Sequence, residues 1–77
     1  MTWFLLVYHR SRRALVDRHD YSASSLQDAV KERAILTEKF ISDPEVEVVL
    51  LGAQSEDDLR ITHRRYFSGE ERVKQAQ

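Results

Sequence analysis

The chain has 77 residues, a net charge of −1 and no cysteine. This length allows one small domain, and without cysteine neither a disulfide nor a thiolate-bound metal can reinforce it. The balanced charge is far from the strongly basic composition of dedicated nucleic-acid-binding domains, and the apolar run at residues 3–8 is too short to cross a bilayer. We therefore expect a cytoplasmic protein with no membrane partner.

Two strands are expected first. Residues 3–8, WFLLVY, are apolar on both alternating sets of side chains, which is typical of a central strand covered on both faces. Residues 14–21 mix apolar and charged side chains on both sets, as in a half-exposed edge strand. A turn over residues 11–13 would join the two strands as a hairpin.

A helix and a third strand follow. Ser24 with Gln27 three residues later is a capping-box pattern, and it predicts a helix over about residues 25–42. Pro44 ends this helix because proline disfavours the helical conformation at the residue before it. Residues 45–53, EVEVVLLGA, are largely apolar on both alternating sets and predict another strand.

Residues 56–67 fit either a strand or a helix. Alternation of Leu59, Ile61 and Phe67 indicates a strand. Ser55 as N-cap, three acidic residues after it and two arginines near the end suit the dipole of a helix, which we favour. Residues 70–77 have little to bury and are expected to form a frayed tail.

Together these elements predict an α+β domain over residues 1–69, arranged as a two-layer ββαβα fold. The predicted sheet is antiparallel with strand order 2-1-3, and both helices cover the same face. The other face would then be an uncovered apolar patch, which favours a homodimer whose sheets pack face to face. The candidates for this dimer face are Trp3, Leu5, Val7, Val49 and Leu51.

Charge is segregated along the chain. Residues 9–20 and 60–65 hold seven arginines and all three histidines, whereas residues 43–58 hold six acids and no base. The arginine-rich hairpin suits either an acidic partner protein or nucleic-acid phosphates, and Tyr8 and Tyr21 are candidates for stacking on bases. The candidate binding residues are Arg10, Arg12, Arg13, Arg18, Arg64 and Arg65.

Catalytic and metal-binding signals are weak. His9 and His19 cannot form a joint metal site in either hairpin register considered, and no nucleophile or phosphate-loop motif is present. The candidates for a pocket are His63, on the apolar side of the second helix, and Arg33, near the middle of the apolar face of the first. Pairing of Arg33 with a carboxylate of the sheet is the expected structural explanation. We expect no metal and no cofactor.

The segment DPEVEVVLLGAQSEDDLRITHRRYF, residues 43–67, resembles small uncharacterised bacterial proteins. In these a valine-rich strand passes through Gly-Ala into a Ser-capped helix that ends in an aromatic pair. The resemblance implies the second helix, but no activity and no site residues. The leading expectation is a non-catalytic homodimeric protein-binding or regulatory module. The alternatives are an RNA- or DNA-binding protein and a small enzyme with a site between subunits.

Overall fold

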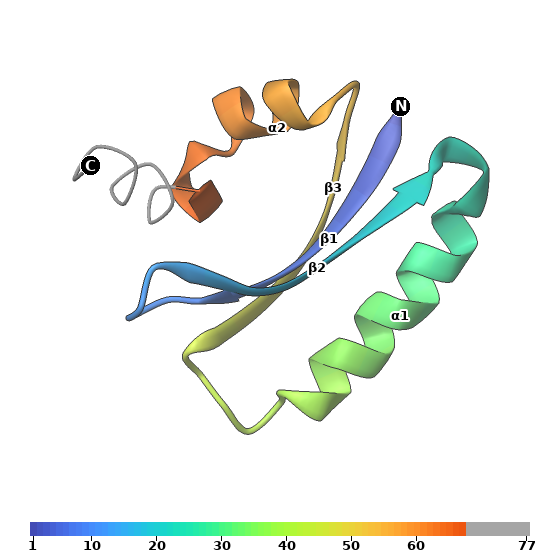
Figure 1. The fold of residues 1–77 in the computed structure, drawn as a ribbon. Coiled ribbons are helices and arrows are strands. Elements are labelled where there is room, and N and C mark those ends of the chain that lie inside the picture. Colours follow the sequence, from blue (N-terminus) through green and yellow to red (C-terminus); the bar gives the residue numbers. More distant parts are fainter. Residues whose placement is uncertain (68–77) are drawn as a thin grey trace.

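The computed structural model describes residues 1–67, in which a three-stranded antiparallel sheet carries one helix on each face (Figure 1). The predicted α+β class and the strand order β2-β1-β3 are confirmed. The tail predicted over residues 70–77 lies outside the described residues. The elements are β1 Thr2–His9, β2 Ala14–Ser22, α1 Leu26–Lys39, β3 Val46–Ala53 and α2 Glu56–Thr62, with short 3-10 helices η1 Ala23–Ser25 and η2 Arg64–Phe67.

Strand β1 is central because it pairs with β2 on one side and with β3 on the other. Leu5 lies opposite His19 of β2 and opposite Leu50 of β3. The two flanking strands shield the backbone of β1, and the helices cover its side chains, so that every residue from Phe4 to Tyr8 is buried. This confirms the sequence interpretation of a strand covered on both faces.

The two faces of the sheet hold separate apolar clusters. Leu5 and Val7 pack with Leu36 of α1 on one face. Phe4, Leu6 and Tyr8 pack on the other face with side chains of α2 and η2, namely Leu59, Tyr66 and Phe67. The prediction that both helices cover the same face is therefore wrong. The physical reason is that both apolar faces of the sheet need cover, and the chain itself supplies a helix for each.

The predicted dimer face is not a single surface. Leu6 lies opposite Val49 and Leu5 opposite Leu50, so Val49 projects to the face opposite that of Leu5. Leu5 and Val7 are also completely buried inside the chain. The five candidates Trp3, Leu5, Val7, Val49 and Leu51 are thus divided between the two faces, and each face already carries a helix.

The predicted start signal is confirmed for α2 but not for α1, where the expected capping box of Ser24 and Gln27 is not formed. The Ser55 hydroxyl accepts a hydrogen bond from the Asp58 amide at 3.2 Å, as expected of the N-cap of α2, and the helical interpretation of this segment is confirmed. The first helix is shorter than the predicted residues 25–42. It begins after the 3-10 turn η1, without a side-chain cap, and ends at Lys39.

The orientation of α1 differs from the predicted apolar face. Ala29 and Leu36 point into the core, whereas the apolar side chains of Val30 and of Ile41, just beyond the helix, are 45% and 70% exposed. Arg33 is exposed, and its side chain makes no ion pair or hydrogen bond within residues 1–67. The expected pairing of Arg33 with the sheet is therefore wrong. The cause is a rotation of the helix that places Leu36 over the sheet and turns Arg33 toward solvent.

No helix within residues 1–67 has the length and hydropathy needed to span a bilayer.

Candidate functional site

The hairpin between β1 and β2 meets η2 at one end of the sheet, although the two segments are far apart in the sequence. A pocket of about 280 Å³ lies between them, lined by Tyr8, Arg10, Arg13 and Arg65. We refer to these four residues as the arginine pocket. Arg10 and Arg13 come from the hairpin loop and Arg65 from η2, so the pocket exists only because α2 and η2 cover this face of the sheet.

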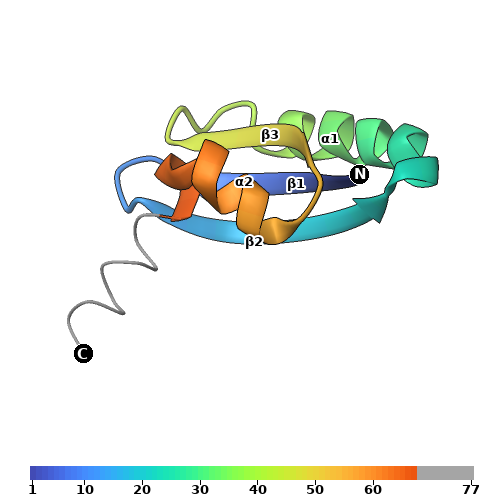
Figure 2. The ribbon, with the colours of Figure 1, turned by 90° about the horizontal axis from the view of Figure 1, so that it is seen from above.

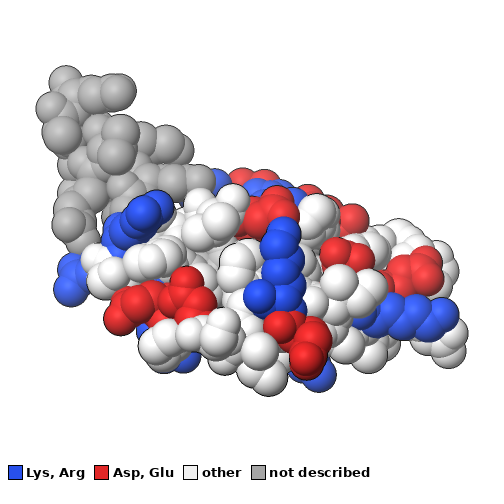
Figure 3. Space-filling view, turned by 90° about the horizontal axis from the view of Figure 1, so that it is seen from below, with Lys and Arg blue, Asp and Glu red and all other residues white. Residues whose placement is uncertain are grey.

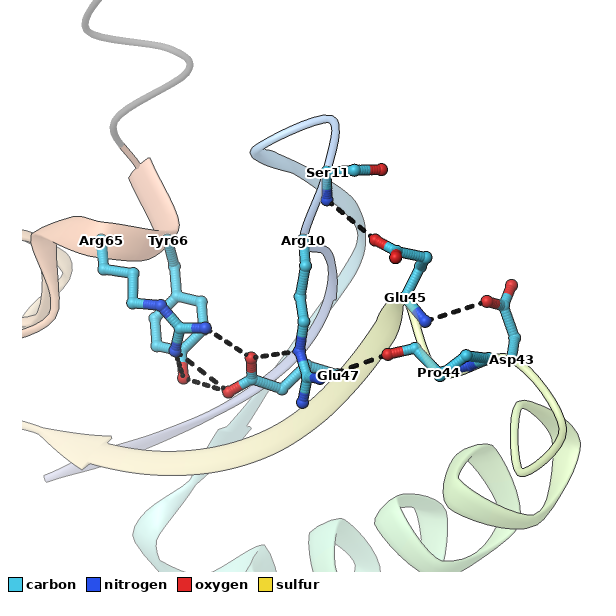
Figure 4. A network of polar contacts seen from close by, with 8 residues as sticks. All are labelled: Arg10, Ser11, Asp43, Pro44, Glu45, Glu47, Arg65 and Tyr66. Atoms are coloured by element: carbon cyan, nitrogen blue, oxygen red, sulfur yellow. Dashed lines mark hydrogen bonds and ion pairs between the residues drawn. The ribbon is translucent and has the colours of Figure 1, made fainter.

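The hairpin loop is held against the beginning of β3. The Arg10 amide donates to the Glu45 carbonyl at 2.8 Å. The Ser11 amide donates to the Glu45 carboxylate at 3.2 Å (Figure 4). Within the loop, the Arg13 amide donates to the Arg10 carbonyl at 3.2 Å. Arg13 has a φ of 53°, in the left-handed region that residues with a side chain seldom adopt. The loop therefore has a defined shape that presents Arg13 to the pocket.

Glu47 is the polar centre of this end of the sheet. Its carboxylate accepts hydrogen bonds from Arg65 at 2.8 and 3.2 Å, from the Tyr66 hydroxyl at 2.7 Å and from Arg10 Nε at 3.4 Å (Figure 4). The Glu47 side chain is only 17% exposed. The hydrogen bonds from Arg65, followed by those from Tyr66 and Arg10, hold the pKa of Glu47 below its ordinary value against the opposing effect of burial. One carboxylate thus fixes two guanidinium groups that line the pocket.

Two tyrosines support the arginine side chains from beneath. The rings of Tyr8 and Tyr66 meet edge to face, with centroids 5.1 Å apart at 89°. The Arg65 guanidinium carbon lies 5.5 Å from the Tyr8 centroid and 5.0 Å from that of Tyr66, which is cation–π geometry. Burial, followed by the contact with Glu47, raises the pKa of Tyr66, so this phenol stays protonated and donates to the carboxylate.

The positions of the two tyrosines predicted to stack on bases do not allow such stacking. Tyr8 is buried beneath the pocket, where the edge of Tyr66 already meets its ring. Tyr21 is half-buried on the α1 face, where burial and the nearby carboxylates of Glu32 and Asp28 raise its pKa. Neither ring offers an exposed face beside the arginine-rich loop, so the stacking interpretation is not supported by the geometry.

Arg13 differs from its two neighbours in the pocket. Arg10 and Arg65 both contact Glu47, whereas Arg13 forms no ion pair or side-chain hydrogen bond within residues 1–67. Its guanidinium therefore retains all five of its donors for a ligand. Guanidinium groups bind carboxylates and phosphates in a bidentate manner, and the pocket is consequently suited to an anionic group.

Arg18 has a structural role outside the pocket. Its guanidinium donates to Asp20 at 2.8 and 2.9 Å and to Glu56 at 2.7 Å, and it lies 5.4 Å from the centroid of Phe4. The hydrogen bonds to Asp20, followed by that to Glu56, raise the pKa of Arg18. Arg60 donates to the same Glu56 at 3.0 Å. These contacts connect β2 to α2 and leave Arg18 unsuited to a ligand.

The remaining arginine candidates are exposed but lie outside the pocket. Arg12 is in the hairpin loop beside Arg13, and Arg64 begins η2. Neither forms an ion pair within residues 1–67. Arg12 is therefore a matched control for Arg13, because it has the same charge and belongs to the same loop but does not line the cavity.

Arg33 and His63 do not form a common pocket. Arg33 belongs to α1 and His63 follows α2, and these helices lie on opposite faces of the sheet. His9 and His19 are also separate, because His19 faces Leu5, four residues from His9 along β1. His19 contacts Asp17 at 2.9 Å, and no group of three metal-ligating side chains is found within residues 1–67.

The two carboxylates that join the layers predict acid destabilisation. The pKa of Glu56, like that of Glu47, lies below its ordinary value of 4.5, here because of hydrogen bonds from Arg18 and then Arg60. A carboxyl whose pKa is lowered by folding contributes stability above its unfolded pKa, and this is lost as the pH falls through the folded value. We expect the urea midpoint to be steady down to about pH 5 and to fall below that. The variant Glu47→Gln/Glu56→Gln should show a weaker fall, and an equal one would contradict this assignment.

The sequence interpretation missed Glu47, Tyr66 and the role of Tyr8 beneath the pocket. The sequence does contain one signal for Glu47, because this residue is a lone charge between apolar residues of the strand. A half-buried carboxylate requires hydrogen-bond donors, and the arginines of residues 60–65 are the next group of such donors along the chain.

No protein-family model, curated protein or solved structure matches this chain.

Proposed function

We propose that the protein is a non-catalytic binding module that recognises an acidic group on a partner protein through the arginine pocket. The observation that carries the proposal is the convergence of Arg10, Arg13 and Arg65 on one cavity in which Arg13 has no carboxylate partner within residues 1–67. Glu47 holds Arg10 and Arg65 in place before any ligand arrives. Such preorganisation lowers the entropy cost of binding. In this proposal the module acts in the bacterial cytoplasm, which the resemblance of residues 43–67 supports.

A protein partner suits this geometry better than a nucleic acid. Phosphate backbones are bound by extended basic surfaces, but the α1 face of the domain, opposite the arginine pocket, has basic and acidic side chains interspersed (Figure 3), so the basic surface does not continue around the domain. Arg18 is occupied by Asp20 and Glu56, and Tyr8 is buried. Nucleic-acid binding remains the second candidate function because the exposed Arg12 and Arg64 flank the pocket residues in sequence and form no ion pair within residues 1–67.

A matched pair of substitutions separates these two functions. We expect Arg13→Asn to weaken binding of a fluorescein-labelled hexaglutamate peptide by roughly tenfold or more, because a charge-assisted hydrogen-bond pair is lost. Arg12→Asn should change the affinity by less than about twofold, since an exposed charge outside the cavity contributes little. Asparagine tolerates a positive φ, so Arg13→Asn keeps the loop conformation. Fluorescence anisotropy at about 150 mM salt measures both affinities.

The same assay with a single-stranded oligonucleotide tests the second candidate. If nucleic acid is the ligand, the oligonucleotide binds more tightly than the peptide, Arg12→Asn and Arg13→Asn weaken it equally, and the affinity falls steeply with salt. That result, or a failure of the peptide to bind the wild-type protein, would overturn the proposed function.

A further inference from the structure

The sheet has two edges, and only one of them is protected against pairing with another strand. Strand β2 carries the run of charges Asp17, Arg18, His19 and Asp20, and its pairing with β1 is interrupted by a bulge beside Val7 and Tyr8. Strand β3, VEVVLLGA, has a regular register and a single charge, Glu47. Charges and bulges are the devices by which edge strands avoid association, and β3 lacks them apart from that one residue.

The outer edge of β3 has unpaired backbone groups. The Arg10 amide donates to the Glu45 carbonyl, which fixes the alternation of hydrogen bonds along the two strands. The backbone N–H and C=O groups of Glu47 and of every second residue after it therefore point toward β1. Those of Val48, Leu50 and Gly52 point away from the sheet. Within residues 1–67 these three residues have no backbone hydrogen bond outside the sheet. The edge thus presents three donors and three acceptors to an incoming strand.

Apolar side chains gather beside this same edge. Helix α1 runs along the β3 side of the sheet (Figure 2). A groove of about 340 Å³ separates Thr37 of α1 and Ile41 of the turn after it from Val46 and Val48 of β3. Val30 lies on the same stripe of α1 as Thr37, two helical turns earlier. Val30 is 45% and Ile41 70% exposed, so the flank of α1 and the turn that follows it are partly apolar and uncovered beside the open edge.

We propose that β3 pairs in antiparallel orientation with β3 of a second copy, which joins the two sheets and places the two α1 flanks side by side. The surface is complementary to itself. With Leu50 on the two-fold axis, Val48 lies opposite Gly52 and Glu47 lies opposite Ala53, so the only charge of the strand meets no like charge. Parallel pairing in register would bring the two Glu47 carboxylates together. This interface replaces the face-to-face packing expected from the sequence, and it does not rest on the arginine pocket.

Gly52 has a specific place in this arrangement. A Cβ atom at position 52 would lie 2.8 Å from the Trp3 ring and 3.2 Å from the Met1 sulfur, so both side chains already occupy the space above the glycine. The opposing Val48 would meet this covered surface rather than a gap. Met1 is itself an exposed apolar side chain, and its sulfur lies beside Gly52 of β3.

Light scattering after size-exclusion chromatography tests the proposal across micromolar concentrations. We expect the wild-type protein to have twice the chain mass of 9.1 kDa. Val30→Lys/Ile41→Lys should weaken the dimer by roughly a hundredfold, because like charges are brought together across the axis. The control is Ile35→Lys/Ile61→Lys, which adds the same charge at positions that are 60% and 66% exposed and do not line the groove beside β3. It should remain dimeric.

Amide hydrogen exchange gives a second readout at the pairing strand itself. The amides of Val48, Leu50 and Gly52 should exchange slowly in the wild-type dimer and rapidly in Val30→Lys/Ile41→Lys, with circular dichroism confirming that this variant is folded. A monomeric wild-type protein, an equal loss of the dimer in the control variant, or rapid exchange of these amides in a dimer would each overturn the proposal. Arg13→Asn should leave the mass unchanged, which separates this interface from the function of the arginine pocket.

Discussion

Replacement of Phe67 by alanine should lower the free energy of unfolding by about 3–5 kcal/mol. Phe67 is completely buried against Phe4 and Leu6 of the central strand, in the cluster that α2 and η2 form on the second face of the sheet. Its removal leaves a cavity that the short η2 segment can fill only in part, and the Arg60 guanidinium loses the ring that lies 4.5 Å away. Urea denaturation followed by circular dichroism measures the loss.

Ile61→Ala is the matched control for this prediction. Ile61 belongs to α2 but is 66% exposed, so its truncation should change the stability by less than about 0.5 kcal/mol. If Phe67→Ala were as mild as the control, the second face of the sheet would not be covered by this segment. That apolar face would then be available for the face-to-face dimer expected from the sequence.

The second large effect is expected at Glu47. Glu47→Ala should cost about 2 kcal/mol, because the carboxylate accepts from Arg65, Arg10 and the buried Tyr66 hydroxyl, and charge-assisted hydrogen bonds exceed neutral ones in strength. We place the value below the upper end of the range for such bonds since the arginines reach solvent. Thermal or urea unfolding at neutral pH measures the change.

Two controls distinguish the loss of the hydrogen bonds to Glu47 from the general effect of removing a carboxylate. Glu45→Ala removes an exposed carboxylate whose side chain accepts only from the Ser11 amide within residues 1–67, and it should cost less than about 1 kcal/mol. The double variant Glu47→Ala/Tyr66→Phe should be less destabilised than the sum of the single variants, because both remove the same 2.7 Å hydrogen bond. Additive losses would mean that this bond contributes nothing to stability.

The strands of the fold were predictable because their signals are local. WFLLVY and VEVVLLGA are apolar on both alternating sets of side chains, and this pattern alone predicts strands covered on both faces. The Ser55 cap likewise fixed the beginning of α2. The same two-sided pattern indicated that something must cover each face. It did not indicate whether a second copy or the chain's own α2 provides that cover, because this choice depends on the path of residues 54–55 rather than on periodicity.

The candidate site was predictable only in part for the same reason. Arg10, Arg13 and Arg65 were all named from charge clustering, but their convergence depends on the face to which α2 and η2 return. Arg18 has the same residue type and a similar sequence environment, yet it is occupied by Asp20 and Glu56. Composition cannot distinguish an arginine available to a ligand from one that connects two layers. That distinction requires the position of the carboxylates.

Binding of an anionic group in the arginine pocket can be observed by NMR of the arginine Nε–Hε signals during titration with hexaglutamate peptide. We predict that the signals of Arg10, Arg13 and Arg65 shift together along one binding curve. The signal of Arg33, which is exposed on α1 across the sheet, should stay in place. Uniform small shifts of all four signals, or no shift of the three pocket arginines, would mean that the arginine pocket is not an anion-binding site.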